Sequence, residues 1–264
     1  MKFIAFVAAA LSVCLPAFAQ LPAPNAAGIS MGHLHFTAKD KAAQTKFWVE
    51  VMGAKPAKLG TLDVLLIPGT LLIVNQGNPT GGTVGSTVHH VGFTVPDLKA
   101  MLAKAEAAGV TIVSRNDQQA MLQGPDEIRI ELSLDATSTV PFRNHHIHFS
   151  TADLEATRQW YVQTFSAVSG KRGKFGAADL PSVNLSFSEA TPAPAGTKGR
   201  SLDHIGFEVK DLEAFTKKLE ATGVHFAVPY RKVPALGISI AFFDRSVGHV
   251  HRADRGSFGS ALAL

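Results

Sequence analysis

The sequence predicts an α+β fold built from four copies of one β-α-β-β-β unit. An eight-residue pattern occurs four times: His, an aliphatic residue, a small residue or His, Phe, a polar residue, a small or β-branched residue, any residue, Asp. Its copies begin at His33, His90, His146 and His204, 56 to 58 residues apart, and a constant period indicates tandem structural repeats. The first and third copies carry His at the third position and the other two carry Gly, which predicts two modules of two units each.

Each copy of the pattern predicts a strand that runs into a helix. In the first copy, residues 33–38 alternate between polar and apolar side chains, as in a strand with two different faces. Asp40 stands where it can cap a helix over residues 42–52, which Gly53 terminates. The other three copies show the same order of a strand, a capping Asp and a helix.

Further strands are predicted between the helices, where β-branched and aliphatic residues are bounded by turn residues. They are residues 62–67, 70–75, 110–114, 119–122, 128–134, 182–188, 237–243 and 248–252. The helices of the first and third copies carry the aromatic pairs Phe47-Trp48 and Trp160-Tyr161 at the same offset. We expect both pairs to pack against the sheets as core residues.

The N-terminus has the features of a secretory signal peptide. Lys2 precedes an apolar stretch that Pro16 interrupts, and an Ala-x-Ala cleavage pattern ends at Ala19. This predicts export to the periplasm or the medium, with no membrane association after cleavage. The single cysteine, Cys14, would leave with the signal peptide, so the mature chain could form neither a disulfide nor a thiolate metal site.

The rest of the chain divides into two modules. Residues 135–144 contain Ala, Thr, Ser and Pro between two repeats, which is typical of a linker. The other predicted boundaries are 1–19 for the signal peptide, 20–30 for a lead-in, 31–134 for module one, 145–254 for module two and 255–264 for a tail.

Composition excludes several functional classes. The chain has 264 residues, of which 46% are hydrophobic and 17% charged, so it is expected to fold around a sizeable core. The net charge is +4, but Lys and Arg are scattered, which argues against nucleic-acid binding. No serine stands in a nucleophile-elbow context and the mature chain has no cysteine nucleophile.

The repeats resemble the vicinal oxygen chelate superfamily, which includes glyoxalase I, type I extradiol dioxygenases and bleomycin-binding proteins. The motif that carries the resemblance, His-aliphatic-x-Phe-x-Val-x-Asp, is clearest at residues 90–97 and 204–211. The resemblance spans residues 30–254. It implies that each module is a cup-shaped, curved mixed sheet with helices packed outside, and that metal ligands come from the first strand of each unit and from a late strand.

The resemblance implies a metal site in module one formed by His33, His90 and Glu131. Two histidines and a carboxylate suit Fe(II) or Mn(II), with Zn(II) or Ni(II) as alternatives. In module two the matching positions are His146, His204 and His251, so a third imidazole replaces the carboxylate and module one is the favoured site. The alternative is that the histidines persist as scaffold without a metal.

His35 lies two residues after His33, so strand alternation places both on one face of the predicted strand. An imidazole titrates near neutral pH, which makes His35 a candidate general base or a group that supports the metal ligands. The alternative is a hydrogen-bonded histidine of the cavity wall.

Together these features predict an exported, divalent-metal-dependent enzyme of glyoxalase or dioxygenase type, acting as a monomer or homodimer on a small substrate with adjacent oxygens. The alternative is a metal-free module that binds a small molecule, as bleomycin-resistance proteins do. Neither specialised enzyme pattern is complete. Residues 71–75 lack the acid that glyoxalase I-like enzymes supply, and residues 111–130 lack the His and Tyr of extradiol dioxygenases.

Overall fold

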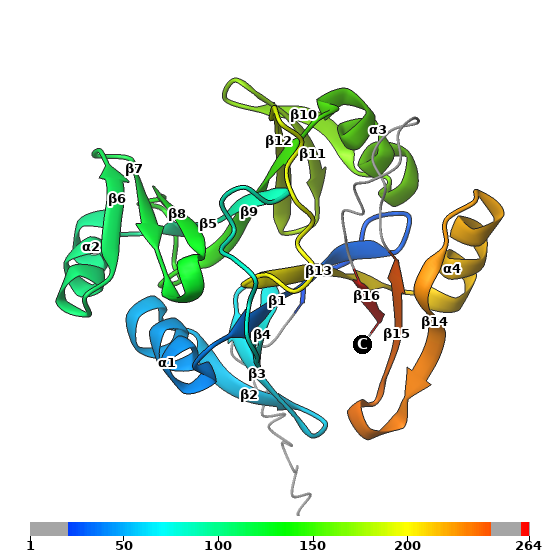
Figure 1. Ribbon diagram of the computed structural model, residues 1–264, viewed down its shortest axis with the longest axis horizontal. Coiled ribbons are helices and arrows are strands. Elements are labelled where there is room, and N and C mark those ends of the chain that lie inside the picture. Colours follow the sequence, from blue (N-terminus) through cyan, green and yellow to red (C-terminus); the bar gives the residue numbers. More distant parts are fainter. Residues whose placement is uncertain (1–20, 244–259, 264) are drawn as a thin grey trace, which may run out of the picture.

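The computed structural model describes residues 21–243 and 260–263 (Figure 1). The predicted signal peptide lies outside the described residues. So does the predicted strand at residues 248–252, which contains His251.

All four repeats are present, and each begins with the predicted strand and helix. The first has β1 (Ile29–Ala38), α1 (Lys41–Lys46) continued by a π-helix (Phe47–Met52), β2 (Lys55–Leu59), β3 (Leu62–Ile67) and β4 (Thr70–Gln76). The second has β5 (Val88–Val95), α2 (Leu98–Ala107), β6 (Thr111–Arg115), β7 (Gln119–Gln123), a 3-10 turn (Pro125–Glu127) and β8 (Arg129–Leu134).

The third and fourth repeats follow the same order. The third has β9 (Arg143–Thr151), α3 (Leu154–Phe165), β10 (Val168–Arg172), β11 (Phe175–Leu180) and β12 (Val183–Glu189). The fourth has β13 (Leu202–Val209), α4 (Leu212–Ala221), β14 (Phe226–Val233), a 3-10 turn (Pro234–Leu236), β15 (Ile238–Phe243) and β16 (Ser260–Ala263). Strands β2, β10, β11, β14 and β16 are additions to those predicted, and β16 lies within the residues expected to form a tail.

The repeats pair into two cup-shaped mixed sheets in an order that differs from the expected one. The first sheet joins repeats one and four in the order β14-β15-β16-β13-β1-β4-β3-β2. The second sheet joins repeats two and three in the order β10-β11-β12-β9-β5-β8-β7-β6. The expectation that consecutive repeats one and two share a cup is therefore wrong, and so is the same expectation for repeats three and four.

The chain path explains this pairing. Strand β8 runs parallel to β5, so both end at the same edge of the second sheet, where Asp135 N–H donates to the Val95 carbonyl at 2.8 Å. The short connection over residues 135–142 then places β9 antiparallel beside β5, because elements joined by a short connection become neighbours. Strands β1 and β13 form the equivalent antiparallel seam of the first sheet.

The packing of the helices joins different pairs of repeats from those that the sheets join. The Trp48 ring lies 5.3 Å from Phe36 of its own repeat and 5.7 Å from Phe93 of the second. Phe165 of α3 lies 4.8 Å from Phe207 of the fourth repeat. Consecutive repeats therefore share an apolar core on the helix side, while the sheets join one to four and two to three. The predicted aromatic pairs belong to this core, with Trp48 fully buried.

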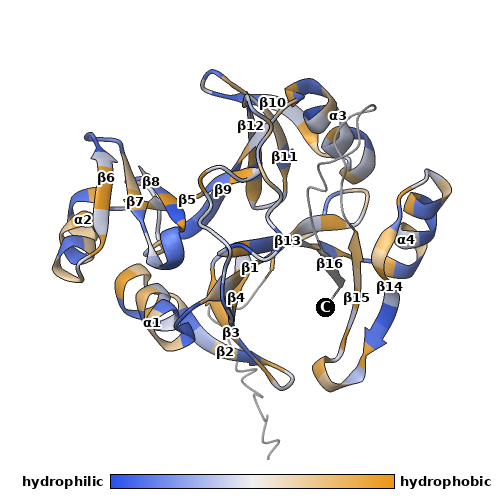
Figure 2. Cartoon of the chain, in the orientation of Figure 1, coloured by the Kyte–Doolittle hydropathy of each residue, from blue (hydrophilic) through white to orange (hydrophobic). Residues whose placement is uncertain are grey.

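The four α-helices lie at the periphery and the first strands of the repeats lie near the middle (Figure 1). Figure 2 shows hydrophilic colour on β9 and β13 in this central region, where several histidines lie. Among the described residues, no helix has the length and apolar character needed to cross a bilayer.

Candidate functional site

The antiparallel seams bring histidines of different repeats face to face. In the second sheet, His146 is opposite Gly92 and His148 is opposite His90. A Cβ atom at Gly92 would overlap the His146 imidazole. The alternation of His and Gly at the third position of the sequence pattern therefore has a steric cause: each glycine leaves room for an imidazole from the paired repeat.

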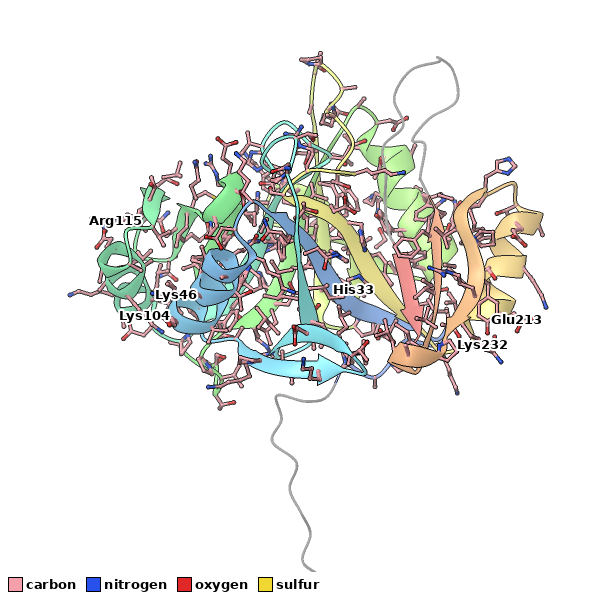
Figure 3. The ribbon with its side chains drawn as sticks, turned by 60° about the horizontal axis from the view of Figure 1, so that its bottom comes forward. His33, Lys46, Lys104, Arg115, Glu213 and Lys232 are labelled. Atoms are coloured by element: carbon pink, nitrogen blue, oxygen red, sulfur yellow. The ribbon has the colours of Figure 1, made fainter. Side chains whose placement is uncertain are left out.

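The first sheet repeats this arrangement. His33 is opposite Gly206, and His35 is opposite His204. A Cβ atom at Gly206 would overlap the His33 ring. His33 lies near the centre of the molecule on β1 (Figure 3).

His90, His146 and Glu131 form a compact group in the second sheet. The two Nε2 atoms are 3.1 Å apart, His90 Nε2 is 3.3 Å from Glu131 Oε2, and His146 Nε2 is 3.7 Å from Glu131 Oε1. Neighbouring ligands at right angles around an ion, each about 2.1 Å from it, are about 3 Å apart. The donor atoms therefore fit a divalent metal held by two imidazoles and one carboxylate.

The ligand groups predicted from the sequence are rearranged in the structure. His90 and Glu131 do lie together, but their partner is His146 rather than His33, because β5 pairs with β9. His33 lies in the other sheet, where its ring nitrogens gather with those of His35 and His204 within 4.8 Å. The expected grouping of His146 with His204 is wrong for the same reason.

A second pair of histidines orients the two imidazoles. His89 Nδ1 lies 2.9 Å from His90 Nδ1, and His145 Nδ1 lies 3.0 Å from His146 Nδ1. When His90 and His146 donate from Nδ1, each Nε2 lone pair is directed at the centre of the group. A hydrogen bond at the far nitrogen is the usual means by which a metal-binding imidazole is held in one tautomer and orientation.

Glu131 presents its two carboxylate oxygens to different partners. Oε1 accepts hydrogen bonds from Ser133 Oγ at 3.2 Å, Gln119 Nε2 at 3.3 Å and Arg172 Nη2 at 2.6 Å. Oε2 faces His90. Burial alone would raise the pKa of Glu131, but the hydrogen bonds from His90 and Arg172, together with the Arg172 charge, outweigh it and hold the pKa well below its usual value. The carboxylate is therefore ionised.

His146, next to this carboxylate, is held neutral. Burial, and secondarily the Arg172 charge, lower the pKa of His146 well below its usual value. Burial also lowers the pKa of His89 and His145. A neutral imidazole keeps the lone pair that a metal needs.

His148 stacks on His90, with ring centroids 4.7 Å apart. Ser186 and Ser188 hydroxyls lie 3.2 Å and 3.0 Å from its two ring nitrogens, and Phe175 contacts its face edge-on at 4.6 Å. Burial and the neighbouring His90 lower the pKa of His148 to about 3. His148 is therefore neutral, is held by contacts on both ring nitrogens, and lines the second cup.

The first sheet contains an all-imidazole group. His204 donates from Nδ1 to Asp203 Oδ1 at 2.6 Å, and the Gly199 N–H donates to Asp203 Oδ2, also at 2.6 Å. Burial and the neighbouring His204 lower the pKa of His35 to about 3. His35, the predicted general base, lies on β1 in the first sheet, whereas Glu131 lies in the second sheet. The residue that takes the place of Glu131 in the strand register is Ser260, which is opposite Gly206.

Several residues of the second cup were missed from the sequence. Arg172 lies on the unpredicted hairpin β10–β11. A signal for that hairpin existed: Arg172 pairs with Phe175 across the two residues Gly173-Lys174, and Gly173 has φ +58°, as tight hairpins require. Strand alternation places His89 and His145 on the face opposite to His90 and His146. They are not in the ligand group, but they touch the ligands through Nδ1.

A cavity of about 800 Å³ lies away from both histidine groups. It is lined by α1 and its π-helical continuation on one side, and by the end of α2 and the 3-10 turn of the second repeat on the other. No histidine lines it. The ligand geometry in the second sheet is therefore the stronger indication of a functional site.

Comparison with known structures supports the fold. Glyoxalase I from Zea mays superposes with a TM-score of 0.67 at 16% identity, covering 89% of this chain and 92% of that one. A glutamate-to-glutamine variant of the Zea mays protein gives 0.69 at 14% identity, covering 89% and 94%. A Bacillus subtilis protein provisionally named a dioxygenase gives 0.62 at 14% identity, covering 88% and 85%.

Comparison of the sequence with curated proteins found no match. The family model of the Glyoxalase/Bleomycin resistance protein/Dioxygenase superfamily matches twice, at residues 30–132 and 143–250. The two matches together cover most of the chain and coincide with the two pairs of repeats. The chain therefore belongs to the Glyoxalase/Bleomycin resistance protein/Dioxygenase superfamily.

Proposed function

We propose that this protein is a metal-dependent enzyme of glyoxalase or dioxygenase type whose working centre is His90, His146 and Glu131. The observation that carries the proposal is the convergence of two imidazole nitrogens and one carboxylate: His90 Nε2 lies 3.1 Å from His146 Nε2 and 3.3 Å from Glu131 Oε2. Two histidines and one carboxylate on one side of an ion leave positions for a substrate.

When bound, a divalent ion would act as a Lewis acid and template for a small substrate with adjacent oxygens, stabilising negative charge on them. Residues of the protein preorganise this site. His89 and His145 orient the imidazoles, while Ser133, Gln119 and Arg172 hold Glu131 Oε1 and leave Oε2 directed inward. The donor set favours Fe(II) or Mn(II), with Zn(II) or Ni(II) compatible.

The same geometry also supports the alternative of a metal-free binding protein. The Nε2 atoms of His90 and His146 are close enough for a direct hydrogen bond, and Arg172 already neutralises Glu131. The N-terminal 19 residues support export in either case.

Metal content decides between these functions. We expect the mature protein, reconstituted with Fe(II) without oxygen or with Mn(II) and then dialysed, to retain roughly one ion per chain at this centre. Glu131→Gln should weaken binding by at least the roughly 10- to 100-fold that loss of a supporting group costs. Glu50→Gln is the matched control because Glu50 is exposed on the π-helix, and His251→Ala should also retain the ion.

Elemental analysis and the thermal midpoint with and without EDTA are the measurements. A wild-type protein that takes up no metal and whose midpoint EDTA leaves unchanged would favour the metal-free binding protein. Loss of the ion in His251→Ala, with retention in Glu131→Gln, would move the working centre to the first sheet.

A further inference from the structure

We propose that Arg172 makes the second cup a site for small anionic substrates, in which a carboxylate or similar oxyanion lies next to a second oxygen. This rests on the proposed function, since the second oxygen and one carboxylate oxygen would complete the coordination at His90, His146 and Glu131.

Arg172 reaches the centre from across the cup. It ends β10, the edge strand of the second sheet, whereas Glu131 lies on β8, and four strands separate β10 from β8 in the sheet order. Their side chains nevertheless meet at 2.6 Å. The curl of the sheet therefore brings the guanidinium to the inner side of the cup, against the carboxylate.

The guanidinium has unused donors. It carries five N–H groups in a planar fork that suits a carboxylate. Among the described residues, its one hydrogen bond goes from Nη2 to Glu131 Oε1. The Arg172 side chain is only 18% exposed, so its remaining donors are largely shielded from bulk water.

The charges around Arg172 favour an anion. Arg172 contacts Glu131, which in turn lies 3.3 Å from His90 Nε2 and 3.7 Å from His146 Nε2, so the guanidinium is next to the ligand group. An imidazole that binds a metal is neutral. Glu131 is then the one anion of the ligand group, and a divalent ion with Arg172 would leave a surplus of about two positive charges.

Two other charged groups of this sheet do not reverse that balance. Arg129 lies two residues before Glu131 on the same face of β8 and adds a further cation. Asp179 on β11 is exposed and accepts a hydrogen bond from Asn184 Nδ2 at 2.6 Å, so its charge is partly satisfied and screened by water.

The neighbouring Lys171 offers a matched control. Ser169, two residues before it on β10, contacts Arg158 of α3, so this face of the strand is turned to the helix. Alternation places Lys171 on that same outer face, where it is exposed, and Arg172 on the inner face. The two residues have the same charge on opposite sides of one strand.

The test uses oxalate, a dianion with adjacent oxygens, and acetoin, a neutral molecule with adjacent oxygens. Binding to the protein saturated with Mn(II) is measured by calorimetry for the wild type, Arg172→Met, Arg172→Lys and Lys171→Met. We expect Arg172→Met to weaken oxalate binding roughly 10- to 100-fold, as for loss of hydrogen bonds to a charged group, while acetoin binding changes less than about 2-fold. The oxalate affinity of Arg172→Lys should lie between those of the wild type and Arg172→Met. The oxalate affinity of Lys171→Met should equal that of the wild type.

Two results would overturn the proposal. An equal loss of oxalate and acetoin in Arg172→Met would mean that Arg172 acts only by holding Glu131, and unchanged oxalate binding would mean that it touches no anion. Arg172→Lys keeps the charge and serves as the second variant should Arg172→Met unfold. A wild type that takes up no Mn(II) would instead refute the proposed function. In that case oxalate binding is measured on the metal-free protein. Binding that is lost in Arg172→Met would still support the anion site, and absence of oxalate binding would refute the anion site.

Discussion

Gly92 determines how close His146 can come to the candidate centre. The glycine faces the imidazole directly across the β5–β9 seam, and any side chain there would occupy the space of the ring. The position that resembled a spacer in the sequence pattern is therefore part of the architecture of the ligand group.

We expect Gly92→Ala to displace His146 and to weaken Mn(II) binding by at least roughly 10- to 100-fold, because metal ligands tolerate little reorientation. Gly206→Ala is the matched control. It should crowd the buried His33 in the first sheet in the same way, yet leave Mn(II) binding at the second sheet unchanged. Metal titration of both variants checks this. Equal loss in both would indicate that the substitutions act by general unfolding.

His35 predicts how stability depends on pH. Its folded-state pKa is about 3, because burial and His204 disfavour the charged form, against about 6.5 in an unfolded chain. Above pH ~6.5 both states are neutral and the residue has no effect on stability. As the pH falls from ~6.5 towards about 3, only the unfolded chain takes up the proton, so the free energy of unfolding decreases by up to about 1.4 kcal/mol per pH unit.

In urea unfolding of the metal-free protein at pH 7 and pH 5, His35→Gln should therefore lose less stability between the two pH values than the wild type. His225→Gln, at an exposed position, should behave as the wild type does. An unchanged pH dependence in His35→Gln would show that His35 is not held neutral in the folded protein.

At the scale of elements, the helix of every repeat begins with an aspartate that caps its N-terminus. Asp40, Asp97, Asp153 and Asp211 each accept a hydrogen bond at 2.9 Å from the backbone N–H three residues ahead. This was predicted from sequence, since the cap is a contact within four residues of chain. The helix is thereby directed back over the sheet at the same point in every repeat.

Asp97→Ala should lower the free energy of unfolding by about 1 kcal/mol, the usual cost of removing an N-cap side chain. Asp117→Ala, in the exposed turn between β6 and β7, is the control and should change stability by less than about 0.5 kcal/mol. Urea denaturation of both variants is the measurement. Equal effects would mean that the Asp97 cap adds nothing beyond an ordinary surface substitution.

At the scale of the whole molecule, the two halves of the chain are interleaved. Each sheet takes one repeat from either side of the linker at residues 135–142, through the β1–β13 and β5–β9 seams. Two modules that were each complete before and after the linker would touch only through their surfaces. The seams therefore tie the two halves together by backbone hydrogen bonds in both sheets.

A protease site inserted at the exposed Ala136-Thr137 tests this arrangement. After complete cleavage the two halves should elute together on size exclusion and keep their metal, because His90 and Glu131 lie on one fragment and His146 on the other. An uncleaved sample is the control. Separation of the halves, with metal retained by the N-terminal fragment alone, would instead support a site within consecutive repeats.

The parts of this protein that sequence alone determined are local or periodic. The four histidine-led strands, the capping aspartates and the aromatic helix faces were all predicted, because each depends on residues within one turn or one strand. Glu131 was predicted as the carboxylate from the resemblance of its strand to a known family. His90 and Glu131 belong to one repeat, so their proximity needed only the parallel pairing of β5 and β8.

Only the tertiary structure decided which repeats share a sheet. His146, rather than His33, completes the group because the short connection after β8 brings β9 beside β5, a contact that the repeat period does not encode. Arg172 reaches Glu131 only because the second sheet curls. A sequence pattern specifies the face on which a side chain lies, but strand pairing and sheet curvature determine what lies opposite it, since both depend on contacts between distant residues.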